Sequence, residues 1–164
     1  MKNNEYEVGE WFFIAEDDEE TADILKNKKP NNAYYHYSQA VEKYLKGYLS
    51  ANNLSVNKNH NISQTLWTCI NHNQSFVEIQ KDCNKMTQAI KKIRYPGGIP
   101  ATEEDVDFAC NLVKKIKILQ PIQQLYNSLI EKYGTDWKQA LFKKIATIEA
   151  IISYKNKLEP ESRV

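Results

Sequence analysis

Apolar residues recur at steps of three and four along almost the whole chain, and this spacing constrains the fold more than any other feature. Such steps place side chains on one face of a helix, whereas a strand needs alternation, which no stretch of the 164 residues shows. The repeats lie at 8–25, 33–48, 62–70, 76–93, 106–119, 122–133 and 137–152. The sequence therefore predicts an all-α protein.

Breakers and capping residues separate the early helices. The run 26–30 places lysines at the negative end of the first helix and closes with a proline. Asn31 or Asn32 is expected to cap the second helix. Ser75 and Glu78 have the spacing of a capping box, which predicts a helix start there.

The later boundaries rest on prolines and glycines. Residues 95–100 contain two prolines and two glycines and should form a loop. Thr102 and Asp105 offer a weaker cap for the following helix. Pro121 should end or kink that helix, and Gly134 fits a C-terminal cap before a last helix.

A chain of this length favours one compact core. We expect an up-and-down bundle of about five helices over residues 1–125. Residues 126–164 are expected to form a C-terminal helical extension packed on the same domain. The last helix is expected to turn one apolar stripe inward, formed by Trp137, Leu141, Ile145, Ile148 and Ile152.

The net charge of +1 hides a polarised distribution. Residues 1–25 carry nine acids and one lysine, whereas residues 26–100 carry eleven bases and three acids. One interpretation is an acidic first helix that packs beside basic helices and is partly neutralised by them. The other is that the basic middle faces an anion such as a nucleotide or an RNA backbone. A total charge near zero argues against a general nucleic-acid coating protein.

The three cysteines, Cys69, Cys83 and Cys110, are odd in number and lack paired spacing, so we expect reduced, mostly buried thiols. The histidines lack the i, i+4 spacing of helical zinc ligands, and no metal or cofactor is predicted. No stretch approaches the roughly 18 apolar residues that cross a bilayer, and the first residues do not resemble a secretory signal. A cytoplasmic location is expected.

One polar stripe on the second helix is a candidate binding site. His36, Gln39, Lys43 and Lys46 follow at steps of three, four and three and should line one helix face. The stripe could present cations, an imidazole and an amide to a phosphate. The alternative is a solvated flank whose lysine stems cover apolar surface and whose charges pair locally with Glu42.

Two further segments could join this stripe in a folded bundle. His60 begins the third helical segment, and Arg94 with its neighbour Tyr95 lies where the long fourth helix meets the proline–glycine loop. If the bundle brings both segments to the stripe, its residues form one anion-binding pocket.

These motifs, taken in order, resemble the HEPN domain of prokaryotes. The resemblance spans roughly residues 8–125 and rests on Trp11-x3-Ala15, the run from His36 to Lys46, His60-Asn61-Ile62-x3-Leu66, Arg94-Tyr95-Pro96 and the helix start at Thr102-Glu103-Glu104-Asp105. It implies a helical bundle, frequent homodimers, and nucleotide or RNA binding. It also implies partnership with a small nucleotidyltransferase, often in toxin–antitoxin pairs.

The resemblance leaves two classes of function open. The family's ribonuclease members carry an arginine, a few polar residues and then a histidine, but no histidine follows Arg94 here. We therefore favour a nucleotide- or RNA-binding or interaction module over an enzyme. The alternative is a metal-independent ribonuclease with His36 or His60 as general base. A homodimer formed through leftover apolar helix faces, including residues 137–152, is also expected.

Overall fold

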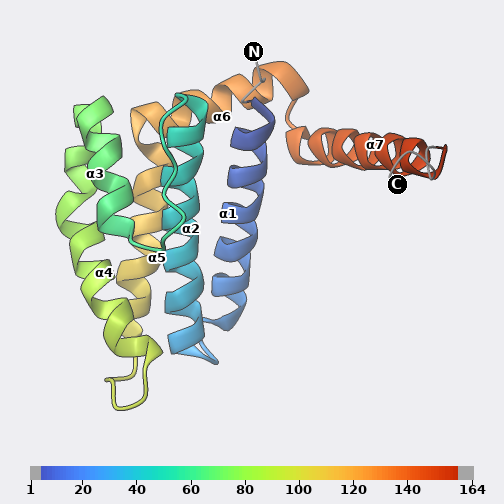
Figure 1. Cartoon of the computed structure of the whole chain (residues 1–164). Helices are drawn as coiled ribbons and strands as arrows, with labels where there is room; N and C mark the ends of the chain where they lie inside the picture. The colour runs from blue at the N-terminus through green and yellow to red at the C-terminus, as the bar shows by residue number, and fades with distance from the viewer. Residues whose placement is uncertain (1–4, 159–164) are drawn as a thin grey trace, which may run out of the picture.

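The computed structural model describes residues 5–158, and every regular element in that range is helical (Figure 1). In chain order the elements are α1 (Glu5–Leu25), α2 (Pro30–Ala51), α3 (Ile62–His72), the 3-10 helix η1 (Gln74–Ile79), α4 (Gln80–Arg94), α5 (Glu103–Ile118), α6 (Gln120–Tyr133) and α7 (Trp137–Leu158). The prediction of an all-α helical bundle is confirmed.

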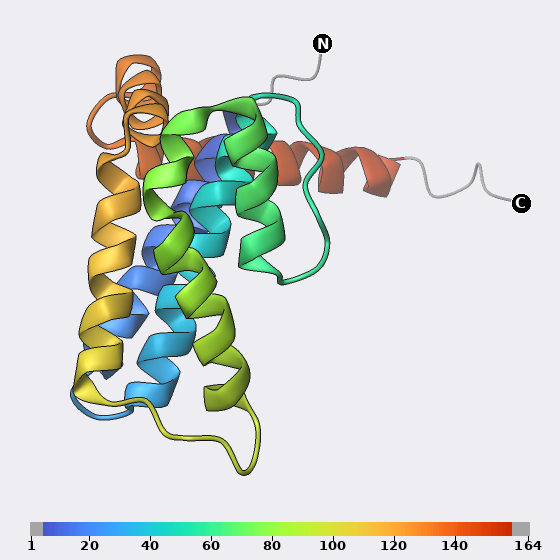
Figure 2. The same cartoon turned by 90° about the vertical axis from the view of Figure 1, so that its left-hand side faces the viewer.

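Helix α2 is the centre of the bundle. It contacts α1 along its length and also packs against α3, α4, α5 and α6. Residues 52–61 run back alongside α2 before α3 begins, so α3 points in the same direction as α2, and the alternation resumes with α4 and α5 (Figures 1 and 2). This returning segment brings the start of α3 next to the polar face of α2.

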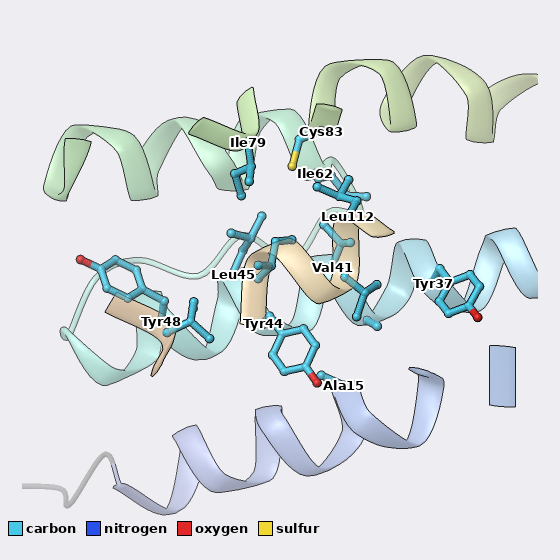
Figure 3. Close-up of a cluster of buried hydrophobic side chains, with 14 of the residues drawn as sticks. Ala15, Tyr37, Val41, Tyr44, Leu45, Tyr48, Ile62, Ile79, Cys83 and Leu112 are labelled. Carbon is cyan, nitrogen blue, oxygen red and sulfur yellow. The ribbon is translucent and has the colours of Figure 1, made fainter. Parts of the chain in front are cut away.

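The core lies between α2 and the helices around it (Figure 3). Tyr37, Tyr44 and Leu45 of α2 are fully buried, and Ile79 and Leu112 reach the same core from η1 and α5. Burying a large apolar side chain contributes about 1.5–3 kcal/mol. The alternation of three and four residues in the sequence therefore corresponds to a continuous buried stripe on α2.

Two expected helix starts are wrong. Helix α2 begins at Pro30 without a side-chain cap, and Asn31 instead accepts a hydrogen bond from the Ala101 backbone N–H at 2.7 Å. Ser75 does not cap the fourth helix: a 3-10 helix, residues 74–79, precedes α4, and its N-cap is Asn73, whose side chain accepts from the Ser75 N–H at 2.9 Å. Asn31 and Asn32 follow Pro30 inside the first turn of α2, so neither occupies the N-cap position, which is Lys29.

The later boundaries agree with the sequence. Thr102 and Asp105 form a complete capping box at the start of α5. Pro121 lies in the first turn of α6, where its missing N–H costs nothing. Gly134 has φ +86°, in the left-handed region that favours glycine, and ends α6.

Helix α7 leaves the bundle at a steep angle and projects from it (Figures 1 and 2). Its first turns contact α1 and α6, and Trp137 and Leu141 are buried there. The expectation that the whole stripe faces inward is wrong in its second half, because Ile148 and Ile152 are 44% and 51% exposed. The bundle ends before α7 does.

All three cysteines are free thiols, as expected: Cys69 and Cys83 are buried and Cys110 is half-buried. Burial raises the pKa of the Cys83 thiol to about 12 and also raises that of Cys69. Over the described range, no helix has the length and apolar character that a membrane span requires.

Candidate functional site

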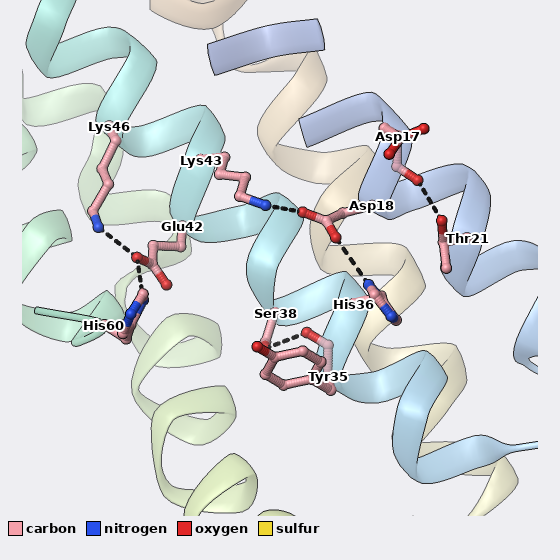
Figure 4. Close-up of polar contacts among 10 residues, drawn as sticks. All are labelled: Asp17, Asp18, Thr21, Tyr35, His36, Ser38, Glu42, Lys43, Lys46 and His60. Carbon is pink, nitrogen blue, oxygen red and sulfur yellow. Dashed lines mark hydrogen bonds and ion pairs between the residues drawn. The ribbon is translucent and has the colours of Figure 1, made fainter. Parts of the chain in front are cut away.

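The polar face of α2 carries two clusters of charged side chains, each built around one carboxylate (Figure 4). We call them the Asp18 cluster, formed by Asp18, His36 and Lys43, and the Glu42 cluster, formed by Glu42, Lys46 and His60. In both clusters one carboxylate contacts one lysine and one histidine. The sequence stripe on α2 therefore folds into two neighbouring groups of charges.

The Asp18 cluster joins α1 to α2. The His36 Nδ1 atom lies 2.8 Å from Asp18 Oδ1, and the Lys43 ammonium donates to Asp18 Oδ2. His36 and Lys43 are seven residues apart and so occupy the same face of α2. Their side chains are 30% and 22% exposed, so solvent reaches this cluster.

The Glu42 cluster is more deeply buried. Lys46 donates to Glu42 Oε1 at 2.5 Å and to the backbone oxygen of Asn59 at 3.2 Å. The side chains of Lys46 and Glu42 are only 6% and 3% exposed. His60 lies at the rim, with Nδ1 3.1 Å from Glu42 Oε1 and a side chain that is 68% exposed.

One atom of the Glu42 cluster is unsatisfied. Glu42 Oε2 is buried and has no hydrogen-bond partner among the described residues. A buried carboxylate oxygen without a donor raises the cost of burying the charge. Glu42 therefore depends strongly on Lys46, which is its most buried cationic partner.

Arg94 and Tyr35 extend the Asp18 cluster towards the end of α4. The Arg94 guanidinium lies over the Tyr35 ring, 4.9 Å from its centroid, and the Tyr35 ring meets the His36 ring edge-to-face at 5.5 Å. A chain of direct contacts thus links Arg94 through Tyr35, His36 and Asp18 to Lys43. Arg94 forms no ion pair with any described residue.

The remaining predicted residues lie near these clusters without joining them. Gln39 is half-exposed on α2 between His36 and Lys43 and makes no described hydrogen bond. Tyr95 is 67% exposed in the loop after α4. The structure thus brings His36, Lys43 and Arg94 into one connected set, whereas Lys46 is turned into the protein.

Sequence reasoning missed Asp18 and Tyr35. It paired Glu42 with both Lys43 and Lys46, but only Lys46 binds Glu42, and Lys43 reaches across to α1. The signal for Asp18 was the acidic first helix, whose partial neutralisation by basic helices is confirmed. Besides the Asp18–Lys43 pair, Glu19 of α1 pairs with Lys117 of α5 at 3.0 Å.

A second polar network lies on the α5–α7 side of α1. The Tyr44 hydroxyl donates to Glu19 at 3.1 Å, and the Tyr126 hydroxyl donates to Glu16 at 3.0 Å. Burial is the main cause that raises the pKa of Tyr44 and Tyr126 above the ordinary range of tyrosine. These tyrosines stay neutral and hold helices together, so we assign this network to stability.

The charged clusters suit the binding of an anion better than that of a metal ion. No group of three or more histidine, cysteine, aspartate or glutamate side chains within residues 5–158 is arranged to hold a metal. A lysine ammonium has three N–H donors and an arginine guanidinium five, and both bind phosphate oxygens. Lys43 and Arg94 therefore keep donors that Asp18 and Tyr35 do not use.

The comparisons with known proteins give one positive result. No curated protein and no solved structure matches the chain significantly. The family model of the HEPN domain matches residues 8–120, which run from Val8 in α1 to just past the end of α5, include both charged clusters and exclude α7. Since this match covers well over half of the 164 residues, the chain belongs to the HEPN domain family and is, in general terms, a nucleotide- or RNA-related module.

Proposed function

We propose that this protein is a binding module that holds a nucleotide or an RNA phosphate at the exposed part of the α2 polar face, and that it is not itself an enzyme. The observation that carries the proposal is the connected set Arg94–Tyr35–His36–Asp18–Lys43. Within this set Lys43 and Arg94 carry donors suited to phosphate, and His36 lies between them.

The phosphate would be shared among three side chains. Arg94 is exposed and makes no described ion pair, so its guanidinium can offer a bidentate contact. Lys43 would keep its bond to Asp18 and use its other N–H groups. His36 lies beside Lys43 on Asp18 and adds its imidazole ring to the set.

Aromatic rings next to the cations support a nucleotide over free phosphate. Tyr35 already stacks on Arg94, and Tyr95 is 67% exposed in the adjoining loop. Base stacking on an exposed aromatic ring contributes about 1–3 kcal/mol per base and tolerates any sequence. A short single-stranded RNA would therefore bind without strong sequence preference.

The test is the binding of a fluorescently labelled single-stranded RNA and of ATP to the full chain at several salt concentrations. Lys43→Ala/Arg94→Ala should weaken binding at least tenfold. It should also reduce the slope of log affinity against log salt concentration, because binding releases about one counterion fewer for each phosphate contact that is lost. The matched control is Lys81→Ala/Lys114→Ala, which removes two exposed lysines outside the clusters. Equal binding by both double variants would refute the proposal.

The proposal extends to a protein partner. On the strength of family membership, we propose that the module works with a separately encoded small nucleotidyltransferase, in a two-component system of the toxin–antitoxin type. If such a gene lies next to this one, the two purified products should form a stable complex in size-exclusion chromatography. Two proteins that elute separately at micromolar concentrations would remove this part of the proposal.

A metal-independent ribonuclease is the second candidate, and a specific observation favours it. His36 and His60 each place Nδ1 against a carboxylate, and Nε2 of each ring has no described hydrogen-bond partner. When Nδ1 donates to the carboxylate, Nε2 becomes the acceptor that a general base needs to remove a proton from a 2′-hydroxyl.

The two candidates separate in one assay. The binding module predicts no cleavage of RNA in the presence of EDTA. The ribonuclease predicts cleavage that His36→Ala or His60→Ala abolishes, while RNA binding falls less than it does in Lys43→Ala/Arg94→Ala. Cleavage that neither substitution changes would indicate a contaminating nuclease and would not support the second candidate.

A further inference from the structure

The apolar stripe of α7 is covered over only half of its length. Trp137 and Leu141 are 5% and 1% exposed where α7 crosses the bundle. Ile148 and Ile152 continue the same stripe at steps of seven and four but are 44% and 51% exposed. Residues 146–153 are all exposed, because no other element lies next to this half of α7 (Figures 1 and 2).

A second uncovered apolar surface lies where α7 crosses α1. This surface is a groove lined by Glu10, Phe13 and Ile14 of α1 and by Leu141, Phe142 and Ile145 of α7. Phe13, Ile14 and Phe142 are 38%, 44% and 65% exposed. Large apolar residues that gather in one exposed groove indicate a surface that binds another helix or chain.

The two surfaces cannot cover each other within one chain. Helix α7 is continuous from Trp137 to Leu158, so its distal half cannot fold back onto a groove that its own proximal half lines. The distal half contains 13 residues, from 146 to 158. At 1.5 Å per residue it reaches about 20 Å beyond the groove.

We propose that two copies of this chain form a symmetric dimer in which the distal half of each α7 lies in the α1–α7 groove of the other copy. Ile148 and Ile152 of one copy would contact Phe13, Ile14 and Phe142 of the other. A dimer with two-fold symmetry covers both apolar surfaces of each copy at once, because each copy supplies one helix and receives one. Because the exchange is reciprocal, the dimer buries twice the apolar area of a single helix in a single groove.

The charges at these surfaces favour a second copy as the occupant. Glu10 lines the groove, and it belongs to the segment 1–25, which has nine acids and one base. Lys155 follows Ile152 by three residues and Ile148 by seven, so it lies on the same helix face and is exposed. In the dimer each Lys155 would face Glu10 of the other copy, the one acidic side chain among the described residues that line the groove.

The oligomeric state of the full chain tests the proposal by sedimentation velocity at tens of micromolar protein. The wild-type chain should sediment as a dimer. Ile148→Asp/Ile152→Asp should weaken dimerisation by roughly a hundredfold or more, because it places four charges in the interface of each dimer. The helical circular dichroism signal should be retained, since both side chains are exposed in the single chain.

The matched control is Ile24→Asp/Ile118→Asp, which changes two isoleucines that are each 71% exposed elsewhere on the bundle. This control should remain a dimer. A second measurement uses Phe13→Cys and Ile152→Cys in separate chains, which should form an intermolecular disulfide when mixed under oxidising conditions.

Three results would overturn the proposal. They are a monomeric wild-type chain, a dimer that Ile148→Asp/Ile152→Asp leaves unchanged, and a dimer that the control pair disrupts equally. A monomer that binds a different protein through α7 is a case of the first result, since the proposed occupant is a second copy.

Discussion

Replacing Lys46 by methionine should destabilise the protein by about 3 kcal/mol. Methionine keeps most of the side-chain length but removes the charge, which leaves the 3% exposed carboxylate of Glu42 without its buried cation. Breaking a buried ion pair costs about 3–5 kcal/mol, because the remaining charge stays desolvated. His60 remains 3.1 Å away, but it is largely exposed, so we expect it to recover only part of this cost.

The double variant Glu42→Leu/Lys46→Met separates charge burial from loss of packing. It removes both charges, so we expect its free energy of unfolding to lie within about 1 kcal/mol of wild type. Both variants are measured by denaturant unfolding, followed by circular dichroism. A single variant that loses less than about 1 kcal/mol would refute the burial argument, and so would a double variant that is less stable than the single one.

Three further predictions concern the core. Gly47→Ala should destabilise the protein by about 1–2 kcal/mol in thermal unfolding, because the new Cβ would lie 2.8 Å from a core phenylalanine ring of α1. The cost of this overpacking exceeds the gain of about 1 kcal/mol that alanine brings in helix propensity. Only Cys110 should react with an alkylating reagent in the native state, whereas Cys69 and Cys83 should react only on unfolding; rapid labelling of all three would contradict their burial. Burial raises the pKa of Tyr126, so the folded state keeps this ring protonated. The free energy of unfolding should hold below about pH 10 and fall above it, because the tyrosine ionises in the unfolded chain there. Absorbance of tyrosinate at lower pH in the folded protein would contradict the raised pKa.

The helices of this chain could be predicted where the deciding interaction is local. Pro121 and Gly134 act through their own backbone restrictions, and both boundaries were predicted. Asn31 was expected to cap α2, but its side chain is taken by the Ala101 backbone N–H, 70 residues further along. Nothing in the neighbouring sequence reports such a partner.

The candidate site shows the same division. The Glu42–Lys46 pair is an i, i+4 contact, and its spacing made it one of the two alternatives for the stripe. Lys43 stands one residue from Glu42 in sequence, yet it points along a different face of α2 and meets Asp18, 25 residues away. Helical periodicity predicted which residues share a face of α2, but the packing of α1 decided which partner each of them has.

The two carboxylates limit what the polar face of α2 can bind. The Glu42 cluster is too deeply buried for a ligand to replace Glu42 without leaving Lys46 desolvated, so this cluster holds the fold together. The Asp18 cluster is more exposed, at 12% for Asp18 and 22% for Lys43, and Arg94 lies beside it without an ion pair to any described residue. A ligand there shares Lys43 with the Asp18 carboxylate, so it must bring enough oxygen acceptors to bind Arg94 as well. A phosphate group meets this requirement, whereas a ligand with a single carboxylate would gain little over Asp18 itself.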